Sequence, residues 1–124
     1  MDIIENLTKQ LEFFSPQTSK KQISVAFPIV LDMNKNCLAL DITSNDCGYK
    51  VSSSSDTFER LNDSAEQYLG LFAAENPQIC DGFCADGEKI YKSFDKDCSI
   101  SCAIDEVIKF LLELDKFVNS KHLK

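Results

Sequence analysis

Apolar and polar residues alternate with a period of two through the middle of the chain. Apolar runs occupy 23–30 and 37–42, and a shorter run ends at Val51. Segments rich in Asn, Asp and Lys separate the runs, which is typical of tight turns between neighbouring strands. The sequence therefore predicts a three-stranded antiparallel meander. We expect Pro28 near a strand end or a sheet edge, because proline cannot donate to a central ladder.

Apolar residues with helical spacing flank the meander on both sides. The first such segment is 3–14, and Pro16 ends it because proline disfavours the helical conformation in the residue before it. The second begins at Thr57 and stops at Pro77, either as one helix or with a break near Asn62 and Asp63. Both segments are predicted to be amphipathic helices.

The last third of the chain predicts a hairpin and a helix. Residues 79–94 hold two short apolar stretches around an Asp-Gly pair, which favours a tight hairpin turn. A final helix is predicted to begin after Asp97 or Ser99, either of which can cap it, and to run to about Ser120. The order helix, three-strand meander, helix, β-hairpin, C-terminal helix indicates α+β architecture. We expect the 124 residues to form a single domain, 1–124.

Charge narrows the range of partners. The formal net charge is −7, and residues 53–118 carry fourteen acids against six basic residues, a net −8. Such a surface repels phosphate, so direct nucleic-acid binding is disfavoured, and two interpretations remain. One is solubility alone; the other is an acidic face that binds a basic, nucleic-acid-handling protein. For the second, the predicted partner-binding residues are Asp56, Glu59, Asp63, Glu66, Asp81, Asp86, Glu88, Asp95 and Asp97.

The location predicted from the sequence is the cytoplasm. The first residues are acidic rather than basic, and no apolar run approaches the roughly 18 residues of a membrane span. We therefore expect no membrane partner and mostly reduced cysteine thiols.

Four cysteines are spaced in two pairs, Cys80 with Cys84 and Cys98 with Cys102. Four thiolates can bind tetrahedral zinc, but structural zinc sites favour two-residue spacers on tight turns, whereas these spacers have three residues. Positions four apart share a face on a predicted strand for the first pair and on a helix for the second. The favoured interpretation is buried or partly exposed thiols, with zinc as the alternative.

Catalytic signatures are weak. The single histidine, His122, is the third residue from the end of the given sequence, so no cysteine or serine has an obvious base. Asp32, Asp41 and Asp46 fall near predicted strand ends, where a metal-dependent nuclease would place acids. Such a site also needs a lysine shortly after the second acid, where this chain has Ile42 and Thr43. The favoured interpretation is solvated turn acids, no cofactor and no enzymatic activity.

Six segments of the meander and the chain after it carry a resemblance to a known family: 27–32, 38–42, 49–52, 57–61, 87–90 and 104–117. They resemble an uncharacterised bacterial and phage family, domain of unknown function 1828. One departure is Ser53-Ser54-Ser55, where the family tends to have an Asp-Asp-Gly turn. The resemblance spans about residues 20–118 and implies the fold and a prokaryotic or phage context, but no activity.

Together these observations predict a non-catalytic acidic protein-binding module. In a phage or mobile-element context it would inhibit a host defence nuclease in the anti-CRISPR manner, by nucleic-acid mimicry. The alternatives are a metal-dependent nuclease or hydrolase that uses the strand-end aspartates, and a small zinc-stabilised interaction domain. Exposed sheet edges and apolar stretches in the first and last helices, including Phe13 and Phe14, are also compatible with a homodimer.

Overall fold

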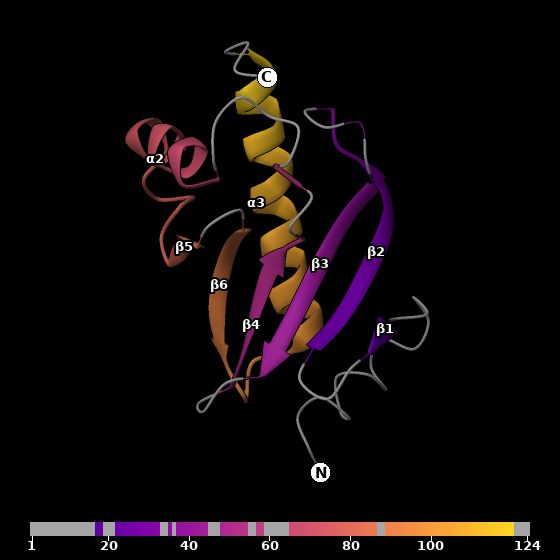
Figure 1. Cartoon of the computed structure of the whole chain (residues 1–124). Coiled ribbons are helices and arrows are strands. Elements are labelled where there is room, and N and C mark those ends of the chain that lie inside the picture. The colour runs from indigo at the N-terminus through magenta and orange to yellow at the C-terminus, as the bar shows by residue number, and fades with distance from the viewer. Residues whose placement is uncertain are drawn as a thin grey trace.

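The computed structural model describes residues 17–18, 22–32, 35, 37–44, 48–54, 57–58, 65–86 and 89–120. These residues form six strands and two helices (Figure 1). The predicted helix at 3–14 lies outside them. The strands are β1 (Gln17–Thr18), β2 (Gln22–Val30), β3 (Cys37–Ser44), β4 (Gly48–Ser53), β5 (Phe83–Asp86) and β6 (Lys89–Asp95), and the helices are α2 (Ala65–Glu75) and α3 (Ile100–Ser120).

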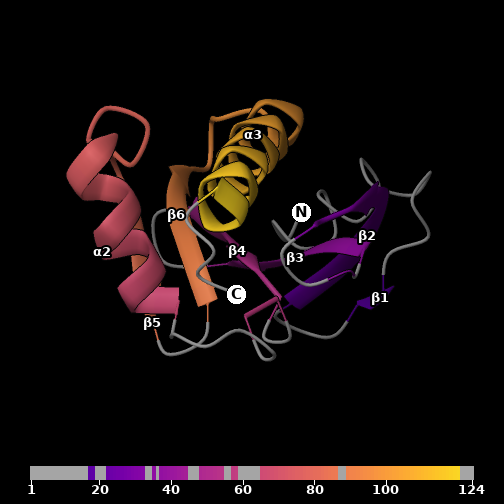
Figure 2. The same cartoon turned by 90° about the horizontal axis from the view of Figure 1, so that it is seen from above.

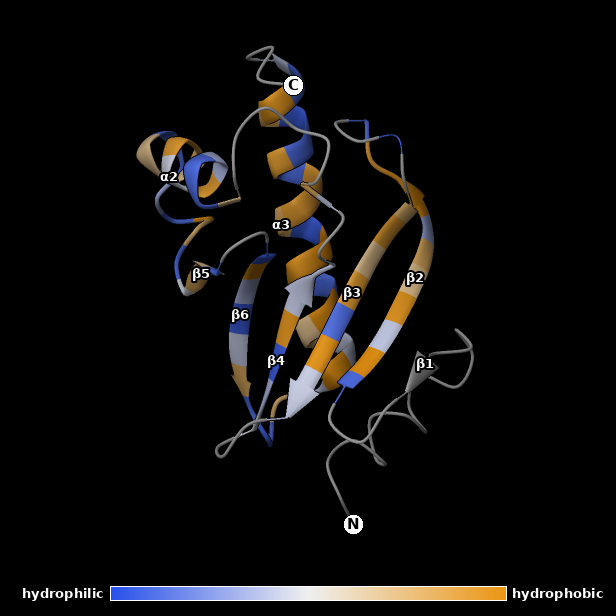
Figure 3. Cartoon of the chain, viewed as in Figure 1, coloured by the Kyte–Doolittle hydropathy of each residue, from blue (hydrophilic) through white to orange (hydrophobic). Residues whose placement is uncertain are grey.

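The predicted meander is confirmed as β2, β3 and β4, which pair in antiparallel order. Alternating apolar and polar residues along these strands are visible in Figure 3. Pro28 lies two residues before the end of β2, near the strand end as predicted, in the stretch between Ala26 and Val30 where the register with β3 shifts. The irregularity explains how a proline, which has no N–H to donate, is accommodated within the strand.

The predicted hairpin is confirmed as β5 and β6, with Asp86 opposite Lys89. Its second strand pairs with β4, so the meander and the hairpin form one sheet of order β1-β2-β3-β4-β6-β5. Gly48 is opposite Asp95 at one end of this joint, and Ser52 is opposite Tyr91 near the other. The chain thus returns to the sheet after α2 and extends it beyond β4.

Helix α3 covers one face of the sheet, as the view from above shows (Figure 2). The apolar residues of β2, β3 and β4 point to this face, because successive side chains of a strand alternate between the two faces. The phenol of Tyr49 in β4 donates a hydrogen bond to the Cys98 carbonyl, 2.8 Å away, and so fixes the start of α3 to the sheet. The largest fully buried side chains of the core are Tyr49, Tyr68, Ile23, Leu31, Leu38, Leu40, Ile42, Ile90, Leu111 and Leu114.

Both helices after the meander were predicted, but only the first residue of α3 was predicted correctly. α3 begins directly after Ser99, whose carbonyl accepts the Ala103 N–H at 3.0 Å, as predicted. In contrast, Thr57 lies in a turn and not in a helix. The Thr57 N–H donates to the Ser54 carbonyl at 3.1 Å and the two hydroxyls are 3.1 Å apart, so local bonds compete with helix formation. Residues 59–64 lie outside the described ones.

No helix of the described part of the chain is both long enough and apolar enough to cross a lipid bilayer.

Candidate functional site

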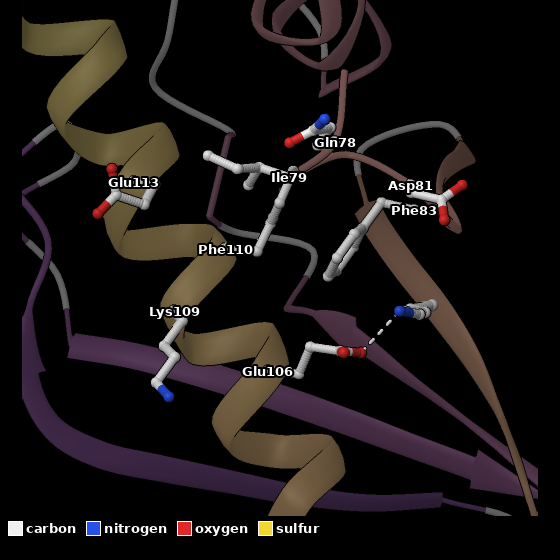
Figure 4. Close-up of a pocket in the computed structure, with 9 residues that line it drawn as sticks. Gln78, Ile79, Asp81, Phe83, Glu106, Lys109, Phe110 and Glu113 are labelled. Atoms are coloured by element: carbon white, nitrogen blue, oxygen red, sulfur yellow. Dashed lines mark ion pairs between the residues drawn. The ribbon is translucent and has the colours of Figure 1, made fainter. Parts of the chain in front are cut away.

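A groove of about 690 Å3 lies beside α3, where the turn that follows α2 meets β5 and β6. Figure 4 shows that its side chains come from two separate parts of the chain, the 78–92 region and the middle of α3. Neither part forms a hollow by itself. The lining residues are Gln78, Ile79, Asp81, Phe83, Lys92, Glu106, Lys109, Phe110 and Glu113.

Two stacked aromatic rings form the floor of the groove. Phe83 of β5 stacks on Phe110 of α3 with ring centroids 4.0 Å apart and planes 13° from parallel. Phe110 is only 2% exposed and also meets Phe72 of α2 at 5.6 Å between centroids. Phe110 therefore belongs to the hydrophobic core, while its stacking partner Phe83 is partly exposed at the surface.

Lys92 of β6 also lines the groove. Its Nζ atom lies 2.7 Å from a Glu106 carboxylate oxygen and 5.4 Å from the centre of the Phe83 ring. Gly82 lies beside this side chain: it has φ of +84°, and an added Cβ would lie 2.9 Å from Lys92 Cε. The lysine thus neutralises Glu106 and lies within the range of a cation–π contact with Phe83.

The other charged side chains of the groove differ in how they are paired. Lys109 lies 2.9 Å from Asp105, which raises the pKa of the lysine above its ordinary value through a hydrogen bond and charge attraction. Glu113 has a longer, exposed pair with Lys116 at 3.5 Å. Asp81 has no ion pair among the described residues. The carboxylates of Asp81 and Glu113 therefore remain the most available to a ligand.

Exposed apolar side chains occur in the groove and on helix α2. Among the described residues three large ones are exposed, and one of them, Ile79 at 42%, lines it. Ile79 also lines a second hollow of about 340 Å3, together with Glu75. A second exposed residue, Leu71 at 46%, is one helical turn before Glu75 on α2. This part of the surface offers apolar contact area that the described residues do not cover.

Five of the nine predicted partner-binding acids lie among the described residues, and all five are exposed. Asp81 is in the groove and Glu66 is in the first turn of α2. Asp86 is opposite Lys89, whereas Asp95 is six residues further along β6, about 20 Å away. Asp97 follows Asp95, so these carboxylates do not converge on one spot. Outside the described residues lie Asp56, Glu59, Asp63 and Glu88.

The structure does not bring the four candidate zinc cysteines together. Cys80 lies in the turn before β5 and not on a strand with Cys84, so the predicted common face of the first pair is wrong. Cys98 precedes the helix that contains Cys102. The described residues contain no group of three or more His, Cys, Asp or Glu side chains that could bind a metal ion. Burial raises the pKa of the Cys80 thiol.

The strand-end aspartates are also separated. Asp41 of β3 is opposite Ser24 of β2. Asp32 follows Ser24 by eight residues, which corresponds to roughly 25 Å at the rise of a strand. The backbone N–H of Asp32 donates to Asp115 of α3 at 3.0 Å. Asp32 and Asp41 therefore do not converge on one metal site. The third residue of that prediction, Asp46, lies outside the described residues.

Asp41 instead belongs to a polar row on the sheet face away from α3. It accepts hydrogen bonds from the Ser24 hydroxyl at 2.8 Å and from the Lys89 ammonium at 2.9 Å. Directly paired residues continue the row across neighbouring strands through Ser52 to Tyr91. Asp41 is only 8% exposed, and neighbouring side chains donate hydrogen bonds to its carboxylate. This arrangement fits a structural role for the pair of Asp41 and Lys89.

The sequence interpretation identified Asp81 but missed the groove around it. The missed residues include Ile79, Phe83 and Phe110, which have the periodicity of ordinary core positions. A weak signal was available at Ile79, which follows a helix-stopping proline closely and begins no regular element. Stacking between β5 and α3 joins residues 27 positions apart, and no local pattern indicates that contact.

Comparisons with protein-family models, with curated proteins and with solved structures gave no match. The resemblance to domain of unknown function 1828 stays a prediction.

Proposed function

We propose that this chain is a non-catalytic binding protein that engages a basic protein partner through the groove beside α3. The observation that carries the proposal is a pair of stacked aromatic rings between carboxylates, bordered by exposed Ile79. In a phage or mobile-element context, the proposed partner is a nucleic-acid-handling defence nuclease whose action the chain inhibits. The net −8 of residues 53–118 favours a partner of opposite charge.

The proposal assigns affinity and selectivity to different groups. Burial of apolar surface supplies most of the free energy of association, and a few central contacts dominate it. Exposed carboxylates such as Asp81 contribute little to affinity individually, but they speed encounter with a basic surface and disfavour acidic partners. A groove with both features selects a basic protein without any bond-making chemistry.

The test is inhibition of nuclease activity in solution. The purified protein is added to each of a panel of RNA-guided nuclease complexes, and the cleaved fraction of a DNA substrate is measured over a salt series. We expect inhibition of a member of the panel, weakened by added salt and by Ile79→Ser. The matched control is Val30→Ser, which changes an apolar side chain that is 61% exposed on β2.

Two results would contradict the proposal. One is full cleavage by every complex at protein concentrations well above those of the nucleases. The other is inhibition that Ile79→Ser and Val30→Ser leave equally unchanged, which would place the contact elsewhere. Light scattering of the protein alone tests the predicted homodimer, since a second copy on the groove would double the mass and compete with the nuclease.

A further inference from the structure

We infer that the groove accepts a partner segment in which one apolar side chain is flanked on both sides by a cationic side chain. This inference rests on the proposed function and specifies the chemistry of the partner at that site. It follows from the order of chemical groups along the groove, and from which of its charges are already neutralised.

The order of groups is visible in Figure 4. Glu113 and Asp81 lie at opposite ends of the groove, and Ile79, Phe110 and Phe83 lie between them. An apolar side chain placed over this middle part would contact Ile79 and the exposed part of Phe83, whose stacking partner Phe110 is buried beneath. Residues on either side of it in the bound segment would then lie near a carboxylate.

The existing ion pairs determine the sign of the flanking charges. The lining residues hold three carboxylates and two ammonium groups. Both ammonium groups are paired at short range, Lys92 with Glu106 and Lys109 with Asp105. An anionic ligand would have to break one of these pairs. A cationic ligand needs no such change, because Asp81 has no ion pair among the described residues and Glu113 has only an exposed one.

Lys92 further shows that this aromatic floor tolerates a cation. Its ammonium lies 5.4 Å from the centre of the Phe83 ring and 5.7 Å from that of Phe94. The negative faces of aromatic rings attract such a charge. Because Glu106 neutralises this ammonium at 2.7 Å, the pair adds no net positive charge that would repel a guanidinium or ammonium of the partner.

The experiment uses two short peptides and three forms of the full chain. The first peptide is Arg-Ser-Leu-Ser-Arg, and the second has Glu in place of both Arg. Binding is followed by changes in the amide NMR spectrum of the protein at about millimolar peptide, the range expected for so small a ligand. The variants are Asp81→Lys and, as a control with the same change of charge, Asp97→Lys. The spectra also show that each variant is folded.

We expect the Arg peptide to shift the amide signals of Ile79, Phe83 and Phe110. Asp81→Lys should weaken its binding by about fivefold, the upper range for one exposed ion pair, and should strengthen binding of the Glu peptide. Asp97→Lys should leave both affinities within about twofold. No shift at the groove, equal binding of both peptides, or equal effects of the two variants would overturn the inference.

The outcome is separable from that of the proposed function. If nuclease inhibition depends on Ile79 but the peptides show no preference for Arg, the inference of flanking cationic side chains is refuted and the proposed binding function stands. If the Arg peptide is preferred but no nuclease is inhibited, the proposed function is refuted and the inference about the groove stands.

Discussion

Replacing two glycines by alanine tests the joint between the meander and the hairpin. At Gly48 in β4, an added Cβ would lie 2.2 Å from the Phe94 carbonyl oxygen and 2.6 Å from the Lys96 nitrogen. Both are backbone atoms of β6 and the turn that follows it, so no side-chain rotation relieves the contact. At Gly70 in α2, an added Cβ meets nothing within 4 Å. The same chemical change should therefore have opposite effects.

The size of each effect follows from the local geometry. Relief of the Gly48 contact requires the two strands to separate by more than an ångström, beyond the range of ordinary overpacking, so we expect Gly48→Ala to cost at least about 3 kcal/mol. That is a large fraction of the roughly 5–15 kcal/mol that stabilises a typical domain. Gly70→Ala replaces glycine in an exposed helical position, which should stabilise the protein by about 0.5–1 kcal/mol.

Thermal and urea unfolding followed by circular dichroism measure both changes. For a chain of this length, we expect Gly48→Ala to lower the melting temperature by roughly 10 °C or more and Gly70→Ala to raise it by a few degrees. A melting temperature of Gly48→Ala close to that of the unmodified protein would show that β4 and β6 do not approach as described. The position of the groove depends on that pairing, since β6 carries Lys92 and β5 pairs with β6.

Two further predictions concern polar contacts of the sheet. Lys89→Met removes the ammonium that binds nearly buried Asp41 and should destabilise the protein by about 1–3 kcal/mol in urea unfolding. The control Lys109→Met, which removes an exposed ion pair, should cost less than about 0.5 kcal/mol, and equal losses would contradict the difference. Burial raises the pKa of Tyr49 well above its ordinary value, so the folded state keeps the phenol proton that the unfolded chain loses above about pH 10. Stability should therefore fall as the pH rises beyond 10, and less steeply in Tyr49→Phe, although that variant loses about 1 kcal/mol at neutral pH with the bond to Cys98. Parallel alkaline curves for the two proteins would refute this assignment.

Local sequence patterns were sufficient to predict the meander, the hairpin and the last helix. The meander follows from alternation that is continuous over each strand, and the hairpin from an Asp-Gly pair between two apolar stretches. α3 begins directly after Ser99, one of the two residues at which the sequence predicted its start. Each of these features depends on residues within a few positions of one another. This is the range over which propensity and turn chemistry act.

Contacts between distant segments were not predicted. The sequence does not indicate that β6 pairs with β4, because an exposed strand edge accepts many partners and register depends on the final packing. Thr57 was predicted to begin a helix because the apolar spacing starts there, but its hydrogen bonds to Ser54 form a turn. α2 begins at Ala65, shortly after the break near Asn62 and Asp63 that the sequence also allowed. The same limitation explains the cysteines, because Cys80 was assigned to a strand that begins only at Phe83.

The fold also changes how the acidic composition should be interpreted. A net charge counted along the chain treats Asp86 and Asp95 as neighbours, yet the length of β6 separates them. Short ion pairs cancel much of the remainder locally, as between Lys92 and Glu106 in the groove. A partner at the groove would therefore meet one or two available carboxylates rather than an extended array. Inhibition through this site should weaken only gradually over the salt series, because apolar contact is hardly screened. A steep loss at moderate salt would instead indicate an extended acidic surface that imitates nucleic acid, and would move the contact away from Ile79.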